Sequence, residues 1–110
     1  MKVSPTPSAS EPTRSEIDAL AEPVLIEFGA AWCGYCRAAE PLVAELLASR
    51  PQLRHVRIED GPGRPLGRSF RVKIWPTLIV MHRGSELVRL VRPADLRPIE
   101  DALAQFEVAA

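Results

Sequence analysis

Two cysteines stand three positions apart in the segment Trp32-Cys33-Gly34-Tyr35-Cys36, and the chain has no others. The segment follows an apolar run and opens a predicted helix. Because the unpaired N–H groups and the dipole of a helix N-terminus stabilise an anion, this position favours the thiolate form of Cys33. Cys36, about one turn further on, is expected to lie close enough to attack a mixed disulfide held on Cys33. The spacing therefore predicts a nucleophilic thiol with a resolving thiol beside it.

Other uses of a cysteine pair fit the sequence less well. A structural zinc site needs four ligands, but the only histidines, His55 and His82, lack zinc-finger spacing. Haem attachment requires a histidine directly after the second cysteine, where Arg37 stands. Two inert buried cysteines stay open as an interpretation, since free cysteine packs as a small hydrophobe. We expect no metal and no cofactor, because the electrons of a dithiol reside on its two sulfurs.

The elements that position the pair are indicated by hydrophobic periodicity and turn residues. Residues 24–28 form a short apolar run closed by Gly29, which is typical of a buried strand. The helix expected over 34–50 contains Pro41, which should kink it. The other predicted elements are a helix over 15–20 capped by Ser15, a strand over 53–58, a loop over 60–67, one helical turn over 68–72, strands over 77–82 and 86–91 joined at 83–85, and a helix over 94–108. This order predicts an α/β fold with a mixed sheet of four to five strands and helices on both faces.

Length and composition limit the classes of protein. A chain of 110 residues with 46% hydrophobic and 25% charged residues is one small domain, which we place at 15–110 after a flexible, proline-containing tail over 1–14. Fourteen basic and fourteen acidic side chains leave no net charge, which argues against nucleic-acid binding. No apolar stretch approaches the ~18 residues of a membrane span. No apolar run of a secretory signal follows Lys2, so we expect a cytoplasmic protein.

The motifs together resemble the thioredoxin family over about residues 15 to 108. The residues that carry the resemblance are Trp32-Cys33-Gly34-Tyr35-Cys36, which matches the family's Trp-Cys-Gly-Pro-Cys except at Tyr35; Pro41; Pro76-Thr77, which looks like the family's cis-proline and its threonine; and Gly84 in the hairpin. The resemblance implies a thioredoxin fold and a monomeric thiol–disulfide oxidoreductase that reduces protein disulfides. Cys33 would be the nucleophile and Cys36 the resolving cysteine, with a separate reductase recycling the pair.

The resemblance also implies a substrate-binding surface beside the cysteines. Pro76 should be cis, and the backbone of Trp75 should pair with an extended substrate strand. The other residues expected there are Trp32, Gly34, Tyr35 and Arg92.

Glu27 stands within the apolar strand, where the family has an aspartate. A buried carboxyl group holds a proton more readily than an exposed one, so Glu27 could accept the proton of Cys36. It could equally be an edge glutamate bonded to a neighbour. Both interpretations stay open at this point.

Two departures from the family bear on function. Tyr35 replaces a proline, and its extra N–H is expected to stabilise the Cys33 thiolate and raise the reduction potential. Arg92 replaces a glycine beside the substrate groove and adds bulk and charge. With Arg64, Arg68, Arg71 and Lys73 it forms either an ordinary solvated face or a surface that selects acidic proteins or glutathione. An exported disulfide oxidase or isomerase, and a thioredoxin-fold binding module without catalysis, are the alternative functions.

Overall fold

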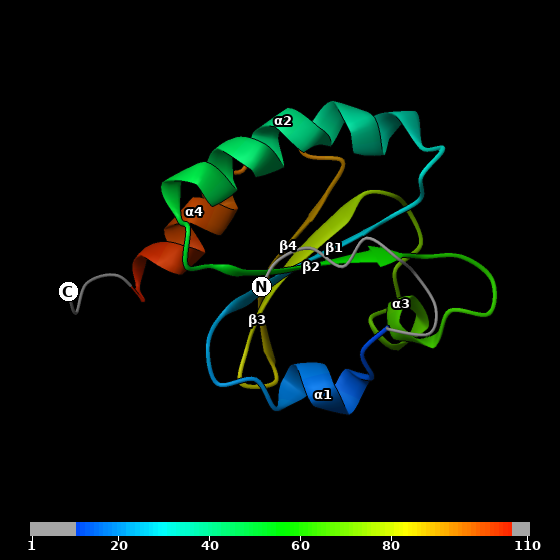
Figure 1. Ribbon diagram of the computed structural model, residues 1–110, viewed down its shortest axis with the longest axis horizontal. Helices are drawn as coiled ribbons and strands as arrows, with labels where there is room; N and C mark the ends of the chain where they lie inside the picture. Colours follow the sequence, from blue (N-terminus) through cyan, green and yellow to red (C-terminus); the bar gives the residue numbers. More distant parts are fainter. Residues whose placement is uncertain (1–10, 107–110) are drawn as a thin grey trace.

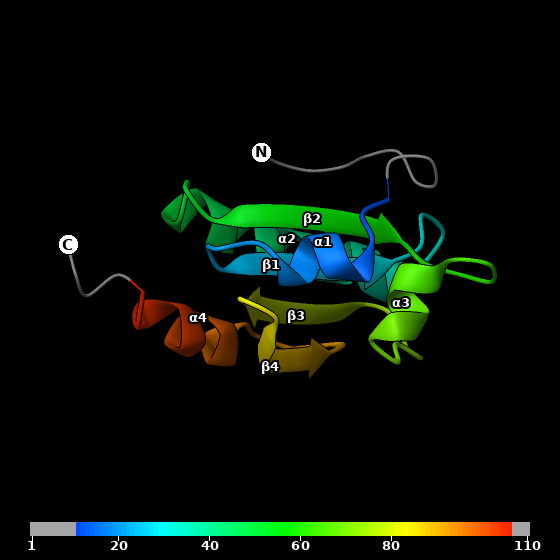
Figure 2. The same cartoon turned by 90° about the horizontal axis from the view of Figure 1, so that it is seen from below.

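Four strands form one mixed sheet in the order β2-β1-β3-β4 in the computed structural model, which describes residues 11–106 (Figure 2). The elements are α1 (Arg14–Asp18), β1 (Val24–Gly29), α2 (Gly34–Ser49), β2 (Arg54–Glu59), α3 (Pro65–Ser69), β3 (Thr77–His82), β4 (Ser85–Val91) and α4 (Arg97–Ala104). β1 is parallel to β2 and antiparallel to β3, and β4 is antiparallel to β3. The predicted α/β architecture is therefore confirmed, with four strands within the described residues.

Helices cover both faces of the sheet (Figure 1). The side chains of Leu25, Leu78 and Val80 pack with those of α2 and α4 on one face, and Ile26, Phe28, Ile79 and Met81 pack with α1, α3 and Phe70 on the other. Because successive side chains of a strand point to opposite faces, a strand covered on both faces needs apolar residues at almost every position. This explains why β1 and β3 read as continuous apolar runs.

The strand directions bring four chain segments to one end of the sheet. The paired residues Phe28 and Thr77, Gly29 and Glu59, and Thr77 and Val91 mark where β1, β2 and β4 end and β3 begins. The segments after β1, β2 and β4 and before β3 therefore meet. They contain Cys33, Asp60, Arg92 and Trp75, respectively.

The helix boundaries differ from expectation at three places. The N-cap of α1 is Thr13 rather than Ser15, because Thr13 and Glu16 form a reciprocal capping box. Helix α3 begins at Pro65, inside the segment expected to be a loop, because proline is favoured in the first helical turn. Helix α4 begins at Arg97 rather than residue 94, and the end predicted at 108 lies outside the described residues. Helix α2 runs from Gly34 to Ser49 with Pro41 inside it.

The predicted tail over 1–14 lies mostly outside the described residues. Its last residues make contacts with the domain: a carboxylate oxygen of Glu11 accepts the N–H of Leu66 at 3.1 Å, and Arg14 belongs to α1. The ordered chain thus extends at least to Glu11. Within the described part of the chain, no helix is long and apolar enough to span a bilayer.

Candidate active site

Cys33 is the N-cap residue of α2, the longest helix described. Its Sγ accepts a hydrogen bond from the backbone N–H of Cys36 at 3.1 Å, so an unpaired donor of the first helical turn points at the sulfur. The same Sγ lies 3.9 Å from the carbonyl oxygen of Trp75. Both cysteines are free thiols, and Cys33 is only 6% exposed. The site thus offers the sulfur the N–H donor and helix dipole that stabilise a thiolate.

Cys36 lies against the end of β1 and faces a small pocket of about 170 Å³ that Glu27 also lines. Burial raises the pKa of Cys36 to about 12, and the contact with Cys33 and the charge of Glu27 add to the rise. The absence of a side chain at Gly29 leaves room for Cys36, because a Cβ at residue 29 would lie 2.8 Å from Cys36 Sγ. Cys36 therefore holds its proton firmly until a base removes it.

Glu27 is buried and bonded to a histidine. Its Oε1 lies 2.9 Å from Nε2 of His55, which is buried as well, and 3.7 Å from Nε of Arg57 on the surface. The expectation of a glutamate bonded to a neighbour is confirmed, but an edge position is wrong, since β1 lies between β2 and β3. The neighbour bond and the pocket shared with Cys36 occur together, so the two interpretations of Glu27 are compatible.

The residues expected to bind substrate lie around Cys33. The Trp75–Pro76 peptide bond is cis, as the resemblance implies. Trp32 and Trp75 meet edge to face at 5.5 Å between ring centroids. Trp32 is 71% and Tyr35 59% exposed, which gives the thiol an apolar border open to solvent.

The side chain of Arg92 lies across the surface beside Cys33. Its backbone has a φ of 48°, and its N–H donates to the carbonyl oxygen of Pro76 at 3.0 Å. Its Nε–H donates to the carbonyl oxygen of Trp75 at 2.8 Å, and its Cζ lies 3.8 Å from the centroid of the Tyr35 ring. The side chain thus bridges the first turn of α2 and the segment before β3.

Comparison with known proteins identifies the family. The family model described as Thioredoxin matches residues 7–105. The chain belongs to the thioredoxin family. It is 36% identical over 89 residues to thioredoxin from Mycolicibacterium smegmatis, an alignment that covers 74% of this chain and 80% of that protein. It is a thiol–disulfide oxidoreductase that reduces protein disulfides through its Cys-x-x-Cys dithiol, as the sequence predicts.

Solved structures agree with this assignment. Reduced thioredoxin 2 from Pseudomonas aeruginosa is 48% identical, with a TM-score of 0.75 over 94% of this chain and 95% of that one. Thioredoxin NaTrxh from Nicotiana alata, at 24% identity and a TM-score of 0.69 over 89% of this chain and 96% of that one, shares the fold.

A second sequence relative joins two proteins in one chain. The bifunctional thioredoxin reductase/thioredoxin of Mycobacterium leprae is 31% identical over 87 residues, which are 74% of this chain and 19% of that protein.

Four residues near the thioredoxin-type dithiol were not singled out from the sequence. His55 and Arg57 contact Glu27. Because residues two apart in a strand point to the same face, the sequence could have placed His55 and Arg57 on one face of β2. Asp60 accepts the indole N–H of Trp75 at 2.9 Å and packs on Gly67, where a Cβ would collide with its carboxylate. This contact gives the glycine-rich segment before and within α3 a structural role: it lets Asp60 hold Trp75.

The contact predicted for Tyr35 is not found among the described residues, whereas Gly34 opens the helix as predicted. The backbone N–H that reaches Cys33 Sγ belongs to Cys36, and no described hydrogen bond joins Tyr35 N–H to that sulfur. The contact expected to raise the reduction potential is therefore not formed. Gly34 is the first residue of α2, with open space where a Cβ would stand.

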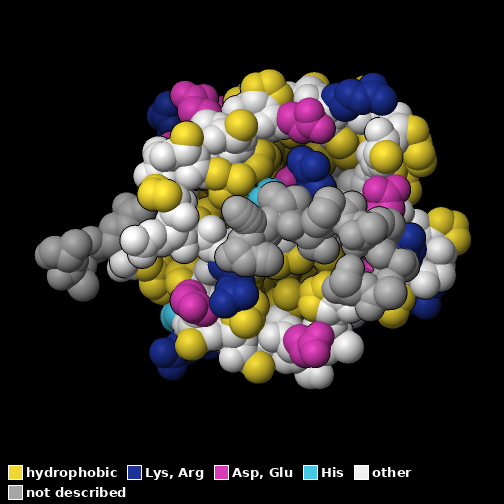
Figure 3. Space-filling view, in the orientation of Figure 1, with side chains coloured by type: hydrophobic (Ala, Val, Ile, Leu, Met, Phe, Trp, Pro, Cys, Tyr) yellow, Lys and Arg dark blue, Asp and Glu magenta, His cyan; other side chains and the backbone are white. Residues whose placement is uncertain are grey.

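The predicted basic surface is only partly formed. A pocket of about 290 Å³ is lined by Trp75 and Asp60 together with Arg64, Arg68 and Lys73, whereas Arg71 and Arg92 are not part of its lining. Elsewhere, on the face seen in Figure 3, basic and acidic side chains are interspersed. The basic side chains that do gather in a pocket lie next to Trp75.

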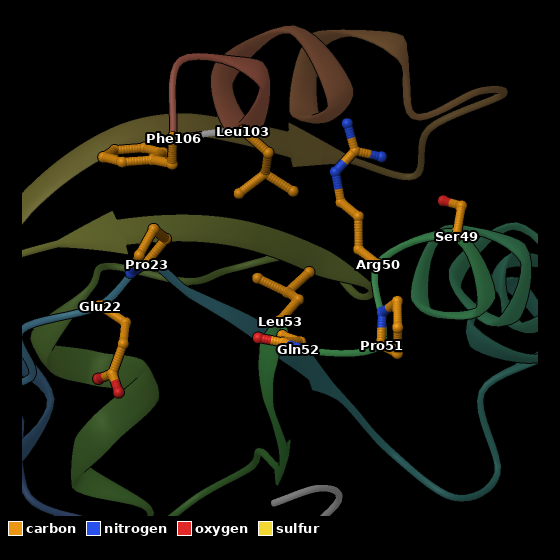
Figure 4. A pocket seen from close by; sticks show the side chains of 9 residues that line it. All are labelled: Glu22, Pro23, Ser49, Arg50, Pro51, Gln52, Leu53, Leu103 and Phe106. Carbon is orange, nitrogen blue, oxygen red and sulfur yellow. The ribbon is translucent and has the colours of Figure 1, made fainter. Parts of the chain in front are cut away.

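The opposite end of the sheet carries a different pocket, of about 400 Å³. Figure 4 shows Leu103 and Phe106 on one side of it and Pro23 and Leu53 on the other. No cysteine lines it, and its residues precede β1 and β2 or belong to the end of α4 and the residues just after it. Among residues 11–106, no three His, Cys, Asp or Glu side chains are grouped closely enough to hold a metal ion.

Proposed function

We propose that Cys33 is the nucleophile and Cys36 the resolving thiol of this reductase. The Cys33 thiolate attacks one sulfur of a substrate disulfide, forms a mixed disulfide and releases the other sulfur as a thiolate. Cys36, once deprotonated, attacks Cys33 Sγ, and the second substrate sulfur leaves. Two electrons pass to the substrate, which takes up two protons, and a Cys33–Cys36 disulfide remains. The observation that carries this assignment is the Cys36 N–H directed at Cys33 Sγ from the start of α2.

Glu27 accepts the proton of Cys36 in this proposal. Both side chains line the same pocket, which has room for water to carry the proton between them. The charge of Glu27 raises the pKa of Cys36, so the two groups interact electrostatically. Nε2 of His55 lies 2.9 Å from Oε1 of Glu27, and a hydrogen bond between them keeps the carboxylate in place and stabilises part of its negative charge.

The substrate lies as an extended segment along Trp75 and Pro76, with the exposed rings of Trp32 and Tyr35 on either side of the reacting thiol. Backbone groups before β3 supply the hydrogen bonds of an added strand, and the rings supply apolar contact. The electrons return from a separate reductase, which is supported by the relative that joins thioredoxin reductase and thioredoxin in one protein. Cytoplasmic location and monomeric state stay predictions, to be tested by cell fractionation and size-exclusion chromatography.

Insulin reduction by dithiothreitol, catalysed by wild type, Cys33→Ser and Cys36→Ser, tests the cysteine roles. We expect Cys33→Ser to lose all catalysis, because burial raises the pKa of the remaining thiol, Cys36, to about 12 and keeps it protonated. Cys36→Ser, reduced beforehand and then freed of dithiothreitol, should still attack and accumulate as a mixed disulfide with insulin, detectable by mass spectrometry. A mixed disulfide that accumulates on Cys36 in Cys33→Ser instead would reverse the two roles. An inactive wild-type protein would leave a binding module as the better description.

A further inference from the structure

Arg92 stands where the resemblance implies glycine, and it keeps a glycine-like backbone. Its φ of 48° lies in the left-handed region, which non-glycine residues seldom adopt. The hydrogen bond from its N–H to the carbonyl oxygen of Pro76 ties the end of β4 to the start of β3. The substitution therefore keeps the turn and adds a long cationic side chain beside Cys33.

The Arg92 guanidinium group is hydrogen-bonded to the carbonyl oxygen of Trp75, with which a substrate strand has to pair. Nε–H donates to Trp75 O at 2.8 Å, and this same oxygen lies 3.9 Å from Cys33 Sγ. Cys33 is 6% exposed while Arg92 lies there. A substrate segment that pairs with the Trp75 carbonyl therefore meets the Arg92 guanidinium at that oxygen, and it either shares the oxygen or displaces the guanidinium.

A displaced guanidinium needs a new partner, and one that stays at Trp75 still has N–H donors beyond Nε–H to offer the substrate. None of the ion pairs among residues 11–106 involves Arg92, so no described carboxylate is already paired with it. Arginine binds a carboxylate through two parallel, charge-assisted hydrogen bonds. A substrate carboxylate would thus bind the guanidinium in either case, whereas an uncharged substrate would form no such charge-assisted bond.

The charges near Trp75 favour the same kind of substrate. Arg68 and Lys73 line the pocket that Trp75 borders, together with Arg64, which lies 3.7 Å from Glu11. Asp60, the carboxylate in that lining, already accepts the Trp75 indole N–H. The local field is therefore attractive to an anion although the whole chain has no net charge.

We propose that Arg92 is a specificity-determining residue that makes this reductase select disulfides flanked by a carboxylate. The inference rests on the proposed function, in which Cys33 attacks a substrate held along Trp75. The carboxylate belongs to an acidic side chain of a protein or to glutathione in a mixed disulfide, and the chemistry of recognition is the same.

The test compares two peptide disulfides that differ only by Glu or Gln next to the attacked cysteine. Second-order rate constants are measured with prereduced protein at low and high salt. We expect wild type to reduce the Glu peptide roughly threefold faster at low salt, with a smaller ratio at high salt. Arg92→Gln should lose the preference.

Arg83→Gln is the matched control. Arg83 is also an exposed arginine with positive φ, but it lies at the other end of β4, and its replacement removes the same charge. It should keep the wild-type ratio. A second pair of substrates, a glutathione mixed disulfide and its diethyl ester, identifies the source of the carboxylate: preference for the Glu peptide alone supports an acidic protein segment, and preference for unesterified glutathione alone supports glutathione.

Three results would overturn the inference. The first is equal reduction of charged and uncharged substrates by wild type. The second is a preference that persists in Arg92→Gln. The third is an Arg92→Gly variant that accelerates both peptides by the same factor and keeps the wild-type ratio, which would make Arg92 an obstruction only. A wild-type protein that reduces neither peptide would refute the proposed function itself, and the inference with it.

Discussion

The two ends of the sheet are built from the same strands but hold different kinds of groups. At one end, the sulfur of Cys33 and the side chain of Arg92 both contact the carbonyl oxygen of Trp75. At the other end, the pocket between Leu53 and Leu103 is lined largely by apolar side chains, and the Arg83-Gly84 turn joins β3 to β4. Both ends have a cavity and an arginine with positive φ.

The difference lies in what the backbone leaves unpaired. Where α2 begins, its first N–H groups have no partner within the helix, and the segment before β3 presents a carbonyl oxygen beside them. At the opposite end, the cavity is lined by side chains that precede β1 and β2 and by those at the end of α4 and just after it. A cavity therefore indicates an active site here only where polar backbone groups point into it, so the two ends should respond differently to substitution.

The largest stability effect is expected at the apolar end. Leu103→Ala removes a buried side chain from the cluster of α4 and the sheet, which should lower the free energy of unfolding by about 2–5 kcal/mol. Because Leu103 lies far from the cysteines in the fold, kcat/KM for insulin should stay at the wild-type value at temperatures where the variant is folded. Urea denaturation and the insulin assay measure the two effects. A fall in kcat/KM of the folded variant would contradict the separation of the two ends.

The largest kinetic effect short of the cysteines is expected at Glu27. Glu27→Gln removes the proposed proton acceptor and should slow resolution of a mixed disulfide about a hundredfold, with the first attack unchanged. Stopped-flow fluorescence of Trp32 and Trp75 separates the two steps. Glu40→Gln is the control, since Glu40 lines the same pocket but is exposed on α2. Equal effects of both variants would argue against a specific role of Glu27.

A smaller effect on both properties is expected at Gly29. In Gly29→Ala the new Cβ would lie 2.8 Å from Cys36 Sγ, so the sulfur must shift, at a cost of about 1–3 kcal/mol of stability. The shift should also slow resolution. Gly34→Ala, with open space around its Cβ, should be harmless or slightly stabilising in α2. Thermal melts, and the rates at which the two variants resolve a mixed disulfide, test this expectation. If Gly29→Ala and Gly34→Ala behaved alike, Cys36 would tolerate the displacement.

The last expected effect is a pH dependence of stability. The pKa of Cys36 rises from an ordinary 9.0 to about 12 in the folded protein, chiefly through burial. Between these values the unfolded chain has lost the proton and the folded chain keeps it, so stability falls as pH rises. Reduced wild type should therefore lose more stability than Cys36→Ala between about pH 8 and pH 11 in urea titrations. Parallel losses in both proteins would mean that Cys36 ionises normally.

Local sequence was sufficient for the elements and for the reacting pair. The apolar runs of β1 and β3, the helical spacing after Gly34 and the glycine turn of the hairpin each depend on neighbours within a few residues. The chemistry of Cys33 also depends on near neighbours, because the helix that begins directly after it favours the thiolate. The start of α1 was predicted wrongly, because Thr13, two residues before the expected cap Ser15, forms the capping box with Glu16.

The contacts of Glu27 and Arg92 could not be obtained in this way. His55 meets Glu27 through the parallel register of β1 and β2, and Arg92 reaches Trp75 and Tyr35 because β4 ends beside the start of β3. These partners are separated by many residues, and a shift of one residue in strand register would turn each side chain to the other face. The sequence alone thus determined which dithiol this protein uses and the fold that holds it. Only the packed sheet decided which charges surround the dithiol, because those distances depend on strand pairing rather than on sequence neighbours.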